Sequence, residues 1–313
     1  MNRLVSRTEI TQYNSIDMVN LIDRFVQFVE VSSSSVRTYS FGIKRFLQFL
    51  GENGINQPTR ESVLMYKNAL IEKHCKPNTI ALYLSSIRRF FMWLEAEGYY
   101  SNIAINVKSP RIDTNHKKDC FSANQLKGIV QGMRQDTLEA KRNRAMFTLI
   151  AACGLRTCEV VRANVEDIRN VMGTPCLFVM GKGKTSKGDF VKLAPQVLEA
   201  IREYLDARGP VEETAPLFAS CSRRNRGQRL TTRTVSQVCK NAMKAAGYDS
   251  PRLTAHSLRH SAVTLALLAG QSLEDVQHFA RHSSITTTTI YSHAVNRLRS
   301  QCEEAIAGAI FAA

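Results

Sequence analysis

Four segments with the periodicity of amphipathic helices fill the first hundred residues of this chain. In residues 16–31, apolar side chains recur at steps of three and four. The next segment begins after the serine run 32–35, which is suited to cap a helix, and ends at Gly51. Two more cover 59–74 and 77–97. Since each helix has one apolar face to bury, four in close succession predict a compact all-α domain.

Residues 102–118 separate this helical part from the rest of the chain. The segment is polar, contains Pro110 and shows no clear periodicity, which is typical of a linker. Charge density also changes here: residues 1–110 carry 13 basic and 9 acidic side chains, and residues 111–313 carry 29 and 18. We therefore expect a first domain over 14–101, a linker over 102–118 and a second domain from 119.

The second part of the chain mixes helical and strand patterns. Short apolar runs at 175–180 and 189–193 flank a Gly- and Lys-rich turn, which predicts a small antiparallel sheet. Ser122 and Gln125 form a capping-box pattern at the first helix. The helices expected here cover 122–134, 139–153, 195–207, 231–246, 256–269 and 272–280. The fold class is therefore mainly α with a small antiparallel β-sheet.

The net charge of +15 and the pI near 9.6 favour a polyanionic partner, either nucleic acid or an anionic membrane surface. No 18-residue apolar run spans a membrane, and the N-terminus lacks the apolar block of a secretory signal. The eight cysteines are scattered, without a CxxC pair, so we expect reduced thiols in a cytoplasmic protein and no zinc site.

The second part of the chain carries a set of cationic, imidazole and phenol side chains in a fixed order. His282 follows Arg259 by 23 positions (282 − 259) and precedes Tyr291 by 9 (291 − 282). The full set is Arg156, in Gly154-Leu-Arg-Thr-Cys-Glu159, Lys182, in Gly181-Lys-Gly183, His256, Arg259, His282 and Tyr291. Two guanidinium groups suit phosphate oxygens, because each offers a charged planar fork. This is the set needed to attack a phosphodiester without a metal ion.

The sequence argues against two other interpretations of these residues, a P-loop and a zincin motif. A P-loop ending at Lys184 and Thr185 would require glycine at position 178, which is Phe178. His256 and His260 have the spacing of zinc ligands, but a zincin has glutamate where Ser257 stands. We therefore expect no metal and no cofactor, and we interpret His260 as a structural residue.

The ordered series from Arg156 to Tyr291 resembles the tyrosine recombinase/phage integrase family, including its Xer-like members. The resemblance runs from about residue 16 to 310. It implies an N-terminal four-helix, SAM-like core-binding domain over 14–101, a mixed α/β catalytic domain over 119–291 and a C-terminal helical tail over 292–313. It also implies a site-specific recombinase or integrase that cleaves and rejoins DNA through a 3′-phosphotyrosyl intermediate, without metal or ATP.

The resemblance assigns a role to each residue of the series. Tyr291 is the nucleophile, and Arg156, Arg259 and His282 surround the phosphate. Lys182 is the general acid for the leaving 5′ oxygen, with Lys184 and Lys187 as alternatives on the same turn. His256 accepts a proton or donates a hydrogen bond, and Glu159 holds Arg156. The chain departs from the family at Ala280-Arg281, where Leu-Gly is common.

Basic side chains outside this series are candidates for DNA contact. They form a basic loop and one face of the following helix, together with two places in the first domain. The candidates are Arg37, Lys44, Arg88, Arg89, Arg223, Arg224, Arg226, Arg229, Arg233, Gln237, Lys240 and Lys244. Family resemblance further implies that the two domains clamp a duplex with inverted-repeat core sites.

We expect a homotetramer on DNA, a monomer or weak dimer when free, and action at the bacterial nucleoid without a membrane. An accessory protein that sets direction is a candidate partner. Ile306 and Ile310 belong to an apolar series, with Leu298 and Cys302, that packs on its own domain or docks on a neighbour. The competing functions are a DNA-binding regulator without catalysis and relaxation of the type IB topoisomerase kind.

Overall fold

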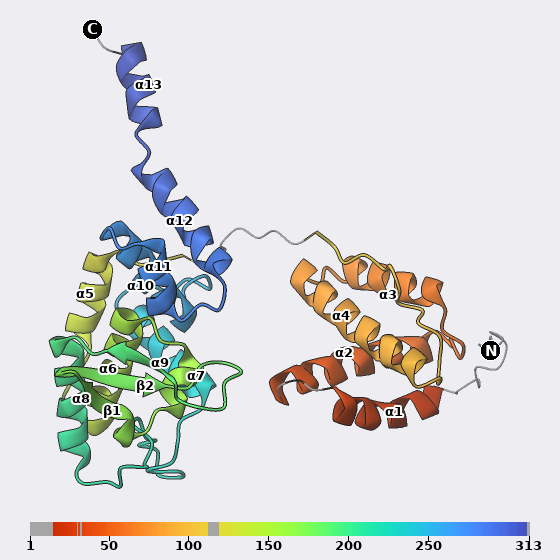
Figure 1. Ribbon diagram of the computed structural model, residues 1–313, viewed down its shortest axis with the longest axis horizontal. Coiled ribbons are helices and arrows are strands. Elements are labelled where there is room, and N and C mark those ends of the chain that lie inside the picture. The colour runs from red at the N-terminus through yellow and green to blue at the C-terminus, as the bar shows by residue number, and fades with distance from the viewer. Residues whose placement is uncertain (1–14, 30, 32, 112–118, 312–313) are drawn as a thin grey trace. The chain divides into compact units, whose positions relative to one another are not determined.

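The protein, seen as a computed structural model, divides into two compact units at residues 115–116. The structure describes residues 15–29, 31, 33–111 and 119–311 (Figure 1). The domain start expected at residue 14, Ser32 of the expected cap, residues 112–118 of the expected linker and the last two residues fall outside this range, as do the side chains of Ile16, Val19 and Leu298.

The N-terminal unit is a bundle of four helices around an aromatic core. The helices are α1 (Ser15–Phe28), α2 (Ser33–Glu52), α3 (Arg60–Glu72) and α4 (Pro77–Ala96). Pro77 opens α4 at a position where its missing N–H leaves no hydrogen bond unmade. The buried ring of Phe90 meets that of Phe25 edge-on at 5.4 Å between centroids. Such pairs add to the stabilisation that burial alone provides.

Two boundaries of this unit differ from those predicted. Helix α2 continues through Gly51 to Glu52, and the turn comes at Gly54, whose φ is 65°. The bundle core also extends past residue 101, since Ile103, Ala104 and Val107 are buried on it. The predicted linker over 102–118 therefore begins too early: its first residues are apolar and complete the core.

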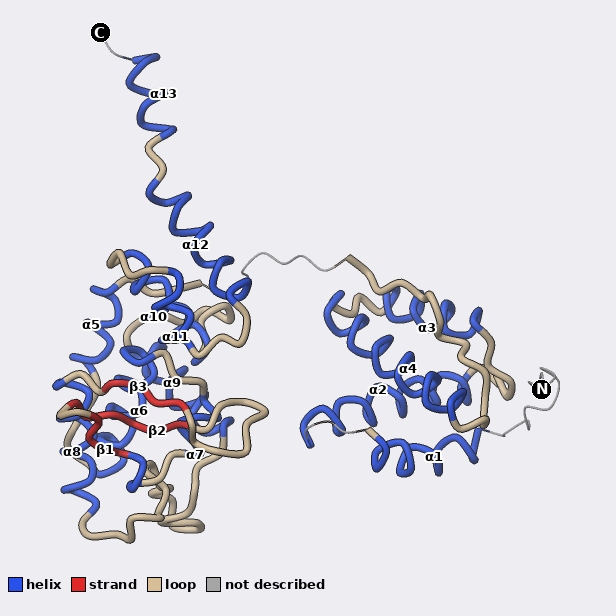
Figure 2. The backbone as a smooth tube through the Cα atoms, in the orientation of Figure 1, coloured by secondary structure: helices blue, strands red, loops and turns tan. Residues whose placement is uncertain are grey.

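In the described chain, the C-terminal unit combines nine α-helices and a short 3₁₀ helix, Val165–Asp167, with a three-stranded antiparallel sheet (Figure 2). Its helices are α5 (Ala123–Gly132), α6 (Leu138–Cys153), α7 (Thr157–Arg162), α8 (Pro195–Arg208), α9 (Thr232–Ala245), α10 (Ala255–Leu268), α11 (Leu273–Ala280), α12 (Ile285–Arg299) and α13 (Cys302–Phe311). The strands are β1 (Ile168–Val171), β2 (Thr174–Val179) and β3 (Asp189–Lys192). The mainly α fold with a small antiparallel sheet is confirmed.

Strand β1 was not predicted, because its two apolar residues, Ile168 and Val171, neither adjoin nor alternate with polar ones. It pairs with β2 through a two-residue turn at Met172 and Gly173, with φ of 49° and 81°. Two successive residues with positive φ make the tight turn that suits the twist of a hairpin. Glycine at the second position was the available signal.

Helix α6 is the centre of the C-terminal core and packs against α8, α9 and α10. Its side chains Phe147, Leu149 and Ile150 are fully buried. The capping box predicted at the preceding helix is confirmed: Gln125 N donates to Ser122 Oγ, and Ser122 N donates to Gln125 Oε1. In contrast, α13 extends away from the unit, and all its described side chains are exposed (Figure 1).

Gly42 and Gly51 lie on the same helix, α2, and make a matched pair for testing the bundle. A Cβ on Gly42 would lie 2.7 Å from Ser86 Oγ on α4, whereas one on Gly51 would meet nothing within 4 Å. We expect Gly42→Ala to destabilise the bundle by about 1–3 kcal/mol through overpacking. Gly51→Ala should stabilise it by up to ~1 kcal/mol through helix propensity.

Urea unfolding followed by tryptophan fluorescence checks this prediction, because Trp93, the single tryptophan of the chain, lies in the bundle core. Effects of the same sign and size at the two glycines would contradict close packing of α2 on α4.

Candidate active site

Two turns, one after α6 and one after α11, bring the arginines of the site together. Gly154 ends α6 with φ of 60°, so the chain reverses and Arg156 becomes the N-cap of α7. Arg259 projects from α10 and is only 2% exposed. Its guanidinium donates to the carbonyl oxygens of Gly154 and Ala280, one in each turn. One buried side chain therefore links both turns.

Arg259 keeps its charge in these surroundings. Burial lowers its pKa to about 10, and the nearby charges of Arg156 and Arg281 act in the same direction. A pKa near 10 still leaves the guanidinium protonated at neutral pH. The site therefore holds a fixed cation in a largely dehydrated position, where its field acts most strongly.

Glu159 on α7 is the counter-ion of the cluster and is fully buried. Its carboxylate accepts hydrogen bonds from the Arg156 backbone N and Nη1, both at 2.8 Å. Burial alone would raise its pKa, but the charge and hydrogen bonds of Arg281, together with those of Arg156, outweigh burial and lower it. The contact expected between Glu159 and Arg156 is present.

Arg281, which adds a charge beside His282 where the chain departs from the family pattern, has partners in the site that the sequence did not predict. Its Nη2 lies 2.9 Å from Glu159 Oε2, and its side chain is only 6% exposed. The two residues are 122 positions apart, so no local spacing relates them. The departure from the usual Leu-Gly at 280–281 was the signal that could have pointed to Arg281.

His282 follows directly and lies beside the arginines. Its Nδ1 hydrogen-bonds Thr288 Oγ1 at 2.9 Å. Burial, and then the charges of Arg259, Arg156 and Arg281, lower the pKa of His282 to about 4. The imidazole is therefore neutral at pH 7, so it donates a hydrogen bond at one ring nitrogen and accepts one at the other.

Tyr291 projects from α12 and is 6% exposed. Its ring stacks on that of His282, with centroids 6.2 Å apart. Burial raises the pKa of Tyr291 to about 12, although the charges of Arg259 and Arg156 pull it down. The phenol is thus protonated in this conformation and lies in the field of two cations.

The Tyr291 hydroxyl hydrogen-bonds the Nδ1 of His260. His260 was predicted to be structural, and its ring lies against the candidate nucleophile, a contact that the sequence did not predict. His256, one turn earlier on α10, is exposed and contacts the His260 ring edge-on at 4.5 Å. The spacing of four between the two histidines was the available signal, since it places them on one helix face.

Lys182 lies on the turn between β2 and β3 and lines a cavity of about 450 Å³ together with Arg156 and His282. The two alternative lysines are paired with carboxylates: Lys184 with Asp189 at 2.6 Å and Lys187 with Asp167 at 2.5 Å. Within the described part of the chain, no carboxylate pairs with Lys182. Lys184 also lines this cavity.

Six of the DNA-contact candidates are exposed and carry no hydrogen bond, ion pair or ring contact within the described chain. They are Arg37, Lys44, Arg223, Arg224, Arg226 and Arg233. Gln237 is also exposed and hydrogen-bonds Asn241 on the same helix. Arg89 lies over the Tyr39 ring at 5.9 Å, and Lys244 pairs with Asp249 at 3.0 Å.

The remaining candidates brace the fold. Arg88 donates to the Val107 carbonyl at 2.8 Å and holds the segment that completes the bundle core. Arg229 donates to the carbonyl of Val161 at 2.6 Å, and Lys240 to that of Ser250 at 2.7 Å. Each of these three side chains donates to a backbone carbonyl of the protein, so a contact with DNA would compete with that hydrogen bond.

Among the described residues, no three His, Cys, Asp or Glu side chains are grouped as metal ligands would be. The same residues include no helix that is both long and apolar enough to cross a bilayer.

Comparison with known proteins identifies the arrangement. Residues 120–297 match the phage integrase family, and residues 22–98 match the SAM-like N-terminal domain of phage integrases. The chain belongs to the phage integrase family. The tyrosine recombinase XerD of Listeria innocua is 27% identical over 298 residues, covering 90% of this chain and 96% of that protein. XerD of Vibrio cholerae is 29% identical over 276 residues, covering 86% and 89%.

Solved structures of integrases share the fold. The site-specific recombinase XerH, bound to palindromic difH substrate in a post-cleavage complex, aligns with a TM-score of 0.73 at 20% identity, covering 95% of this chain and 97% of that one. A lambda integrase tetramer bound to a Holliday junction aligns with a TM-score of 0.66 at 19% identity, covering 90% and 78%. The predicted family, fold and enzyme class, a tyrosine-type site-specific DNA recombinase, are confirmed.

The depressed pKa of His282 can be measured directly. In NMR spectra of isotope-labelled histidine, the ring resonance that is absent from His282→Asn should stay that of neutral imidazole from pH 8 down to pH 5, whereas free histidine titrates near 6.5. The unfolded chain binds this proton near pH 6.5 and the folded one near pH 4, so the free energy of unfolding falls as pH is lowered through that window. A midpoint at 6 or above would contradict the dehydrated, cationic surroundings.

Proposed function

We propose that this integrase cleaves and rejoins DNA at specific sites with Tyr291 as the nucleophile. The observation that carries the proposal is the position of the Tyr291 phenol beside His282, in the field of Arg156 and Arg259. A phosphodiester placed there would meet the nucleophile and fixed cations together. Charge that develops on its non-bridging oxygens would be stabilised without reorganisation of the site.

The reaction balances without an external energy source. The Tyr291 oxygen forms a bond to phosphorus, the bond from phosphorus to the 5′ oxygen breaks, and that oxygen takes a proton from Lys182. His256 was expected to receive the phenol proton, and His260, which hydrogen-bonds the hydroxyl, is a second candidate acceptor. Rejoining reverses these steps with an incoming 5′ hydroxyl. Since a phosphodiester is exchanged for a phosphotyrosyl ester, neither ATP nor a metal is consumed.

The partner in this proposal is duplex DNA with inverted-repeat core sites, acted on at the nucleoid of a bacterial cytoplasm. The net charge of +15 supports a polyanionic partner, and the exposed arginines at 223, 224 and 226 offer it a contact surface. XerH, which shares the fold, is bound to a palindromic substrate. Direction of exchange would be set by an accessory protein.

The nucleophile is tested with a nicked suicide substrate in EDTA, built on a site selected from bound DNA fragments. We expect wild-type protein to form an SDS-resistant covalent adduct and Tyr291→Phe to form none, because a phenyl ring has no oxygen to attack phosphorus. Tyr248→Phe, which alters a tyrosine packed on Phe121 in the same unit, is the matched control and should react normally.

An adduct that persists in Tyr291→Phe would show that another residue is the nucleophile. Binding without an adduct in the wild type would favour the regulator without catalysis.

The general acid is tested with a substrate whose 5′ bridging oxygen is replaced by sulfur, since a thiolate leaves without a proton. We expect Lys182→Ala to slow cleavage of ordinary DNA by roughly 10²- to 10⁴-fold and to cleave the sulfur substrate at nearly the wild-type rate. Lys184→Ala on the same turn is the control and should behave as wild type on both. If Lys184→Ala, and not Lys182→Ala, were slow on ordinary DNA and normal on the sulfur substrate, Lys184 would be the general acid.

We propose further that four copies assemble on DNA and that α13 docks on a neighbouring copy. The helix exposes Ile306 at 59%, Ile310 at 65% and Phe311 at 81%, an apolar side that its own unit leaves uncovered. Exposed apolar faces of this kind typically mark interaction sites. A lambda integrase tetramer on a Holliday junction shares the fold.

Truncation tests the tail. A cut after Asn296 would remove the end of α12, so the cut belongs after Ser300, which removes α13 alone. We expect this variant to bind DNA and form the adduct on the suicide substrate but to lose recombination between two sites. Glu304→Ala, on the exposed acidic first turn of α13, is the control. Full recombination by the truncated protein would rule out α13 as the assembly element.

A further inference from the structure

Arg281 occupies a backbone conformation that ordinary residues avoid. Its φ is 53° and its ψ 46°, the left-handed region in which a Cβ crowds the following carbonyl oxygen. Glycine adopts this conformation freely, and the position caps α11, where glycine is the common choice. An arginine here is unfavourable for the turn itself, so its side chain must supply a compensating interaction.

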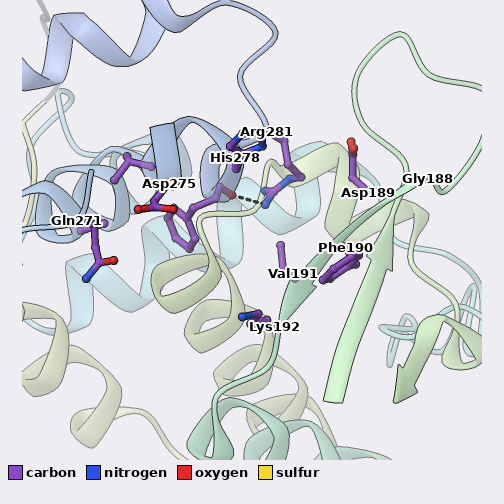
Figure 3. Close-up of a pocket in the computed structure, with 12 residues that line it drawn as sticks. Gly188, Asp189, Phe190, Val191, Lys192, Gln271, Asp275, His278 and Arg281 are labelled. Carbon is purple, nitrogen blue, oxygen red and sulfur yellow. Dashed lines mark hydrogen bonds between the residues drawn. The ribbon is translucent and has the colours of Figure 1, made fainter. Parts of the chain in front are cut away.

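The guanidinium of Arg281 is buried and fully engaged. Its Nη2 donates to Glu159 Oε2 at 2.9 Å and to the Gly154 carbonyl at 3.1 Å, and its Nη1 donates to the Phe279 carbonyl at 2.7 Å. Figure 3 shows the side chain at the edge of a cavity of about 600 Å³ that residues of β3 and α11 line. With every terminal nitrogen bonded to protein, Arg281 is arranged to hold its neighbours and not to bind phosphate itself.

The groups that Arg281 holds belong to the cleavage site. Its backbone carbonyl accepts from Arg156 Nη2 at 3.2 Å, while Glu159 accepts from Arg156 Nη1 at 2.8 Å. Arg281 therefore fixes the guanidinium of Arg156 in two ways. Its backbone carbonyl binds one terminal nitrogen, and its side chain holds Glu159, whose carboxylate binds the other. The next residue along the chain is His282.

Charge explains why a second cation matters at this place. Glu159 is fully buried, and two arginines share it. Without Arg281, the carboxylate would have Arg156 as its one cationic partner among the contacts described here, and it would draw that guanidinium toward itself and away from the cavity. Arg281 thus lets Arg156 keep a net positive field toward the cavity that it lines with His282.

We propose that Arg281 is a positioning residue for strand cleavage: by binding Glu159 and the Gly154 turn, it fixes Arg156 and His282 at the reacting phosphate. The inference rests on the function proposed above. It assigns to this chain an active-site arginine beyond Arg156 and Arg259, acting through them and not on the substrate.

The test compares cleavage and binding in Arg281→Gly, which removes the side chain and also relieves the backbone. We expect DNA affinity to stay within about twofold of wild type, because the Arg281 side chain is 6% exposed and its terminal nitrogens are bonded to protein. The rate constant for adduct formation should fall on the order of 10- to 100-fold, as is typical when a residue that orients an active-site group is lost. Met172→Gly is the matched control: its φ is 49°, its side chain is fully exposed on the β1–β2 turn, and its rate should be unchanged.

Two further variants separate positioning from a role in folding. Arg281→Lys keeps a cation near Glu159 and should recover part of the rate, whereas Arg281→Asn, which tolerates the left-handed conformation, should not. In a Glu159→Gln background, Arg281→Gly should cause little additional loss, because the two residues act as one unit.

Additive losses in the double variant, or a wild-type rate in Arg281→Gly, would overturn the proposal. So would loss of DNA binding in both Arg281→Gly and Arg281→Asn, which would show that the side chain supports the fold. An adduct in the wild type separates these outcomes from failure of the proposed function, since without that adduct both ideas are wrong.

Discussion

The buried charge of Glu159 is the interaction on which the rest of the site depends. Removing a carboxylate from water costs several kcal/mol, and the cost is offset only when charged partners and hydrogen bonds surround it. Glu159 obtains them from the Arg156 backbone and from the guanidinium groups of Arg156 and Arg281. The same contacts fix the cations before any substrate arrives, so a single carboxylate stabilises the fold and prepares the site.

Arg259 provides hydrogen-bond donors for carbonyl oxygens at two helix ends of the same region. The last carbonyls of a helix lack intrahelical partners and carry partial negative charge. Helices α6 and α11 both end where Arg259 reaches, and its guanidinium binds the carbonyls of Gly154 and Ala280. A side chain expected to serve the phosphate therefore also caps two helices, which explains how so polar a group is accommodated at 2% exposure.

Periodicity is a local signal, and it allowed the fold class and most helix positions to be predicted. The grouping of Arg156, Arg259, His282 and Tyr291 in one region followed from the resemblance to the family, since Arg156 and Tyr291 are 135 positions apart (291 − 156). The short strand β1 was missed because Arg169 and Asn170 at its centre break the apolar pattern. The contacts of Arg281 and His260 were not predicted for another reason. Their partners, Glu159 and Tyr291, lie 122 and 31 positions away, and only the folded chain brings them together.

Boundaries were the weakest part of the prediction. The segment 102–118 is polar on average, but Ile103, Ala104 and Val107 pack on the bundle core. The burial of these three side chains, and not the average composition of the segment, sets the domain boundary. Likewise, Arg88 looked like a DNA contact because a basic side chain on a helix is usually solvated. Its bond to the Val107 carbonyl depends on a chain segment 19 residues away.

The hydrogen bond between the Tyr291 hydroxyl and His260 belongs to a nucleophile that is protonated before any substrate arrives. Burial raises the pKa of Tyr291 to about 12, so at pH 7 only about one phenol in 10⁵ is ionised. In the mechanism proposed above, the proton passes to a histidine of α10 as the bond to phosphorus forms, and no free phenolate is needed beforehand. The free protein therefore holds its nucleophile in a weakly reactive form, and reactivity develops only where a phosphodiester lies against the hydroxyl.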